Sequence, residues 1–118
     1  MDSDTEPAEE WLPKVLQQWD AFMADPNRNA KKYTAFLRFA FKSYAIPATA
    51  RVRKIKTAGR SYHHALNIEY QGGARTMDDM KAKLDEVREL VWRFKAYGIV
   101  TYDYCRGSIT YSHLQIWE

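Results

Sequence analysis

A chain of 118 residues that is 46% hydrophobic and 14% aromatic can fold around one core, which excludes an intrinsically disordered protein. Its length predicts a single domain over 1–118, with residues 1–7 frayed. The one cysteine excludes an internal disulfide, no apolar run is long enough to span a bilayer, and the N-terminus is acidic, unlike a signal peptide. We therefore expect a soluble, cytoplasmic protein without a membrane partner.

The formal net charge of +3 hides a strong segregation of charge along the chain. Residues 1–25 contain one lysine and seven acids, whereas residues 26–64 contain ten lysines and arginines and no acid. Residues 65–118 are nearly balanced, with seven bases and eight acids. Asymmetry of this size within one domain is typical of proteins that bind a polyanion. It predicts that nucleic acid, or the acidic surface of another protein, is the partner.

The N-terminal part predicts two amphipathic helices. Apolar residues over 11–23 fall on one arc of a helix that begins near Pro13 and ends before a turn at 25–27. The second helix is expected from Asn29, as its N-cap, to about Tyr44. Its exposed arc is basic and lacks the acidic i+4 partners that a merely solvated helix usually carries. The bases of this arc are Arg28, Lys31, Lys32, Arg38 and Lys42.

Two strand-like segments follow, over 49–57 and 61–70, joined by a turn at 58–60. Their even-numbered apolar residues, among them Ala50 and Leu66, can share a buried face, which leaves the odd-numbered residues on the other face. The polar residues of that other face are Arg51, Arg53, His63 and Asn67. Ile55 breaks the pattern, because it is apolar and yet lies on the basic face.

The C-terminal part predicts a third helix and a second hairpin. The helix is expected to begin at Thr76, with Asp79 completing a weak capping box, and to end with Gly98 as its C-cap. The hairpin is expected over 99–104 and 109–117 around a turn at 105–108. Its predicted pairs are Val100 with His113, Tyr102 with Tyr111, and Tyr104 with Ile109. The order ααββαββ predicts an α+β fold, with a four-stranded antiparallel sheet made of two hairpins and three helices over one or both faces.

The basic helix and the first hairpin together form the candidate binding site. Lysine and arginine gain affinity for phosphate backbones by displacing condensed counterions, and a two-stranded ribbon fits the major groove of DNA. Because phosphate contacts dominate, we expect modest sequence specificity. The alternative is an ordinary solvated hairpin whose charges keep an edge strand from aggregating. The predicted nucleic-acid-binding residues are Arg28, Lys31, Lys32, Arg38, Lys42, Arg51, Arg53, Lys54, Lys56, Arg60 and His63.

Two aromatic residues lie outside the apolar stripes of their helices. Phe39 falls within the basic arc of the second helix, and Trp92 lies beside Arg88 and Lys95 on the third. Both are candidate partner anchors, because aromatic residues are enriched in interface hot spots. The alternatives are that Phe39 packs under the first helix or in a homodimer, and that Trp92 joins an internal cation–π cluster or is covered by the N-terminal helix.

No motif identifies an enzyme, a cofactor or a metal site. Adjacent His63 and His64 point to opposite faces of a strand, and the basic segment lacks the carboxylates of a metal-dependent nuclease. The leading hypothesis is a non-enzymatic nucleic-acid-binding domain. The alternative is a small protein-binding inhibitor or adaptor, of the phage or mobile-element type, that blocks a nucleic-acid-handling enzyme or ribonucleoprotein. A third hypothesis is a metal-independent ribonuclease that uses His64, Tyr62 and Lys56.

Overall fold

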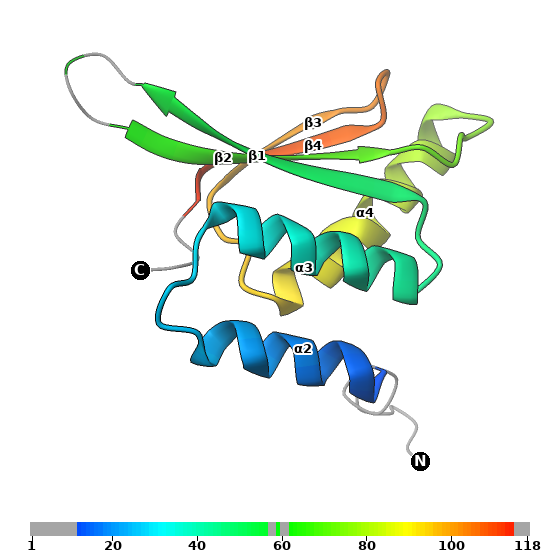
Figure 1. The fold of residues 1–118 in the computed structure, drawn as a ribbon. Coiled ribbons are helices and arrows are strands. Elements are labelled where there is room, and N and C mark those ends of the chain that lie inside the picture. The colour runs from blue at the N-terminus through cyan, green and yellow to red at the C-terminus, as the bar shows by residue number, and fades with distance from the viewer. Residues whose placement is uncertain (1–11, 57–58, 60–61, 115–118) are drawn as a thin grey trace.

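The computed structural model describes residues 12–56, 59 and 62–114. The predicted frayed segment, 1–7, therefore lies outside the described residues. The elements of the described ranges (Figure 1) are α2 (Pro13–Ala24), α3 (Ala30–Ser43), β1 (Ala48–Lys56), β2 (Tyr62–Tyr70), α4 (Met77–Arg93), β3 (Ile99–Asp103) and β4 (Ser108–Leu114). Their order, and the four-stranded antiparallel sheet β1-β2-β4-β3, confirm the predicted α+β fold.

The described elements form three layers. Helices α3 and α4 pack on one face of the sheet, and α2 packs on α3 from the side away from the sheet (Figure 1). This face of the sheet is called the covered face here. No described helix packs on the opposite, open face. The arrangement leaves one face of an antiparallel sheet apolar and the other polar, as its alternating side chains require.

The starts of the helices follow their local capping chemistry. Pro13 occupies the first turn of α2, where its missing N–H costs nothing. The side chain of Asn29 accepts a hydrogen bond from the Lys32 backbone N–H at 2.8 Å. The Thr76 hydroxyl likewise accepts one from the Asp79 N–H at 3.0 Å. All three predicted helix starts are confirmed.

The end of α4 differs from the prediction. The helix ends at Arg93, and Lys95 takes the left-handed conformation that closes it, with φ at +64°. Gly98 is therefore not the C-cap. It lies against β4 instead, where a Cβ atom would come 2.5 Å from the Ser112 carbonyl oxygen. The glycine is required by this close approach of two backbones.

The core lies between the covered face and the helices. Leu66 and Ile68 of β2 and Ile109 of β4 are fully buried there, and each such burial contributes roughly 1.5–3 kcal/mol. Trp19 joins α2 to this core: its ring lies 5.2 Å from the ring of Phe94, measured between centroids. Phe22 and Phe36 complete this aromatic contact.

The predicted register of the second hairpin is wrong by two residues. Val100 pairs with Tyr111, and Tyr102 pairs with Ile109. The turn occupies 104–107, one residue earlier than predicted, because Asp103 anchors it: its side chain accepts from the Arg106 N–H at 3.1 Å, and its carbonyl accepts from the N–H of residue 107 at 2.8 Å. A shift of two residues leaves every side chain on its predicted face.

A candidate nucleic-acid interface on the first hairpin

The hairpin of β1 and β2, called the ribbon here, extends beyond the helices (Figure 1). In the described residues, β4 pairs with β2 only from His64 to Glu69. Lys56 and Tyr62 face each other across the ribbon beyond that region. The outer end of the ribbon, defined as 54–56 with 62–64, is therefore largely a two-stranded structure.

Four predicted cations lie on β1, and all four are exposed. Arg51 and Arg53 project from the open face, as predicted, while Lys54 and Lys56 project from the covered face. Their cross-strand partners are not acidic. Among the described residues, no carboxylate lies within 4.0 Å of any of the four. The positive charge of this strand is therefore not neutralised by the described part of the fold.

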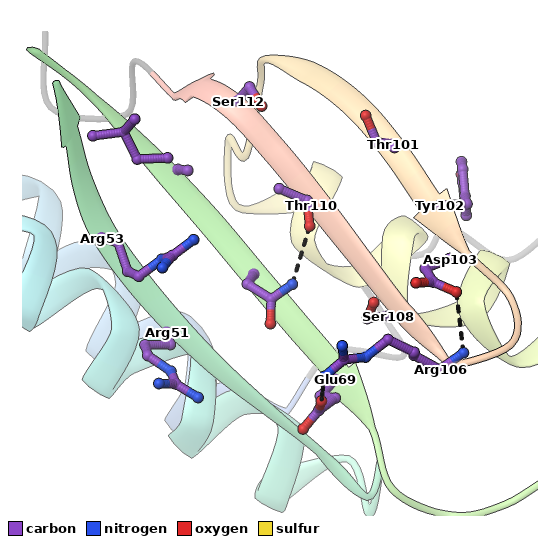
Figure 2. A pocket seen from close by; sticks show the side chains of 13 residues that line it. Arg51, Arg53, Glu69, Thr101, Tyr102, Asp103, Arg106, Ser108, Thr110 and Ser112 are labelled. Carbon is purple, nitrogen blue, oxygen red and sulfur yellow. Dashed lines mark hydrogen bonds and ion pairs between the residues drawn. The ribbon is translucent and has the colours of Figure 1, made fainter. Parts of the chain in front are cut away.

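The open face contains a polar hollow of about 560 Å³, and the two arginines of β1 line one side of it (Figure 2). On its floor, the Asn67 side chain donates a hydrogen bond to the Thr110 hydroxyl at 3.0 Å. Its two acids, Glu69 and Asp103, both contact Arg106: the guanidinium lies 3.9 Å from Glu69, and the backbone N–H donates to Asp103. The side of the hollow formed by β1 thus stays cationic.

The second hairpin supplies half of this hollow, and the sequence prediction did not include it. Thr101 and Thr110 point into the hollow, whereas Val100 and Tyr111, their neighbours in the chain, point to the covered face. Polar and apolar residues alternate from Ser108 to Ser112 of β4, and this was the signal that could have found Thr110 and its neighbours.

Two cations of the predicted basic helix are engaged near the turn between α2 and α3, and one of them, Arg28, precedes the first residue of α3. The Arg28 guanidinium donates to the Met23 carbonyl at 2.9 Å and to the Asp25 carbonyl at 3.2 Å, which closes this turn. The Lys32 ammonium lies 2.8 Å from the Asp25 carboxylate. This hydrogen bond lowers the pKa of Asp25 below its ordinary value. Neither cation is directed toward the ribbon.

The other three cations of α3 lie on its exposed side. The Arg38 Nε donates to the Ala50 carbonyl at 3.1 Å, on the outer edge of β1. Lys31 and Lys42 are exposed and have no acidic partner among the described residues. The structure therefore brings Arg38 to the ribbon, while Arg51 lies on the opposite face of the sheet. The predicted helix and hairpin cations do not form one flat patch.

His63 stacks on His113, with ring centroids 4.0 Å apart and planes inclined by 13°. An irregularity in the pairing of β2 with β4, between His64 and Leu66, allows this contact, and His113 has a φ of +58° there. No sequence pattern predicts such a bulge. The remaining predicted contact residue, Arg60, lies outside the described residues.

The two predicted anchors differ in exposure. Phe39 is half-buried in a groove of about 470 Å³ between α2 and α3, so it packs beside the first described helix. Trp92 is 55% exposed and meets Tyr97 edge-on, with centroids 4.9 Å apart. Arg88 contacts the Tyr102 hydroxyl at 3.0 Å rather than the indole. Trp92, Tyr97 and the 62% exposed Ile99 are called the Trp92 cluster below.

The three residues of the ribonuclease hypothesis share the covered face of the ribbon. Lys56 pairs directly with Tyr62, and His64 pairs with Lys54.

Within the described ranges, no three His, Cys, Asp or Glu side chains could together hold a metal ion. None of the helices in these ranges has the length and apolar content needed to cross a bilayer. No protein-family model, curated protein or solved structure matches this chain, so its function has to be inferred from the surfaces described above.

Proposed function

We propose that this protein is a non-enzymatic nucleic-acid-binding domain that contacts phosphates through the cations of β1. The observation that carries the proposal is that four exposed cations lie on one nine-residue strand, with no carboxylate partner among the described residues. Unpaired cations gathered in this way create a positive potential that attracts polyanions. Nucleic acid gains more than other anions from such a surface, because neutralising its phosphates releases condensed counterions.

Helix α3 extends this potential along one side of β1. Arg38 contacts the edge of the strand, and Lys31 and Lys42 are exposed on the same helix. Arg28 and Lys32 contribute less, because their charged groups are already hydrogen-bonded near the α2–α3 turn. The predicted contact surface is therefore reduced to β1 and the neighbouring side of α3.

The test is the affinity for labelled DNA and RNA, measured by fluorescence anisotropy across a salt series. The logarithm of affinity should fall linearly with the logarithm of salt, with a slope of about −3.6 if four phosphates of duplex DNA are contacted. Replacing Arg51, Arg53, Lys54 and Lys56 by glutamate should abolish binding and leave the circular dichroism spectrum unchanged, because all four side chains are exposed.

A matched control carries the same change of charge elsewhere. Replacing Lys14, Arg75, Lys81 and Lys83 by glutamate should weaken binding far less, because these residues lie on α2, before α4 and on α4. An equal loss in both variants, or a flat response of the wild type to salt, would overturn the proposal. The RNA probe should stay intact throughout, since cleavage that His64→Ala abolishes would identify a ribonuclease instead.

The exposed Trp92 cluster favours a second candidate function, that of an adaptor or inhibitor that docks on the acidic surface of another protein. Large aromatic side chains are the usual anchors of such contacts, and Trp92, Tyr97 and Ile99 are all exposed. The Trp92→Ala variant separates the two functions. It should retain full affinity for nucleic acid if β1 is the binding site. Sedimentation equilibrium of the same variant tests whether the cluster joins two copies of this chain.

A further inference from the structure

The cations of β1 divide between two opposite faces of the ribbon, which restricts the shape of the polyanion that can bind them all. Arg51 and Arg53 project from the open face, and Lys54 and Lys56 project from the other, because neighbouring side chains of a strand alternate. A single row of phosphates, or a flat array of them, can lie against only one of these faces. Two rows, one on each side of the ribbon, are needed to contact both.

Building on the proposed function, we propose that the nucleic acid is B-form duplex DNA and that the outer end of the ribbon inserts into its major groove. Each face of the ribbon then meets one of the two phosphate backbones. One sheet layer with its side chains is roughly 10 Å thick, and the major groove of B-DNA is about 12 Å wide, so the ribbon fits.

Other nucleic acids offer a poorer fit to the same surface. The minor groove of B-DNA is only about 6 Å wide, which is less than the thickness of the ribbon. The major groove of A-form RNA is too deep and narrow for side chains to reach its floor. A single strand has one backbone and leaves the cations of one face without partners.

The fold limits insertion to the outer end. Further along β1, α3 lies against the strand, and Arg38 hydrogen-bonds to the Ala50 carbonyl. On the covered face of the outer end, however, Tyr62 is 56% exposed, so α3 does not cover it.

The test neutralises one face at a time. One variant carries Arg51→Gln and Arg53→Gln, the second carries Lys54→Gln and Lys56→Gln, and a control carries Lys81→Gln and Lys83→Gln on α4. On duplex DNA, each of the first two variants should make the salt slope shallower by about 1.8, which corresponds to two phosphate contacts at about 0.9 each. The control should keep the slope of the wild type. All three should unfold at the temperature of the wild type, because none of the side chains that they change is buried.

The probes are a DNA duplex, its separate strands, an RNA duplex, and the same DNA with bulky substituents on cytosine C5, which project into the major groove. The unmodified DNA duplex should bind most tightly, and the substituents should weaken binding. If only one face changes the slope, or if the separate strands bind as tightly as the duplex, groove insertion is overturned and nucleic-acid binding stands. If the wild type binds none of these probes, the proposed function itself fails.

Discussion

The two hairpins of the sheet contribute to the protein in different ways. In β4 of the second hairpin, Ile109, Tyr111 and Leu114 are buried in the core. At the outer end of the first hairpin, Lys54, Lys56 and Tyr62 are exposed instead. The second hairpin is as long as the core requires, whereas the first continues beyond it. Because Lys54 and Lys56 in that extension are exposed, charge can accumulate there at little cost in stability.

The largest effect is expected when an isoleucine is replaced by alanine in each of the two hairpins. Ile109→Ala should lower the free energy of unfolding by about 2–5 kcal/mol, because the side chain is fully buried. Ile55→Ala, at a half-buried position on the open face of β1, should lower it by only about 1 kcal/mol. Equilibrium urea denaturation measures both values. Equal losses would show that the first hairpin is as important to the core as the second.

A second test compares glycines from the two hairpins. Gly107 has a φ of +71° and Gly59 a φ of +96°, so alanine is strained at both positions, by about 1–2 kcal/mol in the left-handed region. At Gly107 a new Cβ would also lie 3.0 Å from the Met80 methyl group, whereas at Gly59 it meets no atom within 4 Å. Thermal unfolding should therefore show a larger loss for Gly107→Ala. The reverse order would contradict the contrast between the hairpins.

The third test concerns a buried hydroxyl of the second hairpin. The Tyr111 hydroxyl is buried and has no hydrogen-bond partner among the described residues, so Tyr111→Phe should raise the free energy of unfolding by about 1 kcal/mol. Tyr62→Phe in the first hairpin should change it by less than about 0.5 kcal/mol, because that hydroxyl belongs to an exposed side chain. A loss of stability in Tyr111→Phe would show that the hydroxyl is paired in solution.

The same tyrosine gives the smallest predicted effect, at alkaline pH. Burial raises the pKa of Tyr111 above its ordinary value of 10.0. A raised pKa means that the folded state holds the tyrosine proton more firmly than the unfolded state does. The stability that the protonated Tyr111 side chain contributes is therefore complete below pH 10.0, and it is lost as the pH rises above that value. The loss of stability above this pH should be smaller in Tyr111→Phe than in the wild type. Urea denaturation at several alkaline pH values measures the difference.

Local chemistry made much of the fold predictable from the sequence. Asn29 and Thr76 cap their helices with their own side chains, which requires no knowledge of the tertiary structure. Alternation of side chains likewise placed Arg51 and Arg53 on one face of β1. These predictions depend on residues at most a few positions apart, which is why they were confirmed.

Contacts between distant segments made the candidate site harder to predict. The sequence showed Arg28 as part of a basic stripe, but packing of α2 on α3 directs it to the Met23 carbonyl. The contact of His63 with His113 depends on a bulge between two strands from different hairpins. The alternation of side chains predicted that the β1 cations would divide between two faces. The exposure of Lys54 and Lys56, however, depends on the ribbon extending beyond α3, which the sequence does not show.

The contact of Arg38 with the Ala50 carbonyl has a consequence for how several copies behave on one polymer. An uncovered edge strand offers carbonyl groups that a strand of another molecule can recruit, which leads to aggregation. In β1 one of these acceptors is already occupied by a guanidinium, and the lysines and arginines along the strand repel a neighbour of the same kind. On the nucleic acid that we propose as the ligand, crowded copies should therefore stay separate and should not join into a continuous intermolecular sheet.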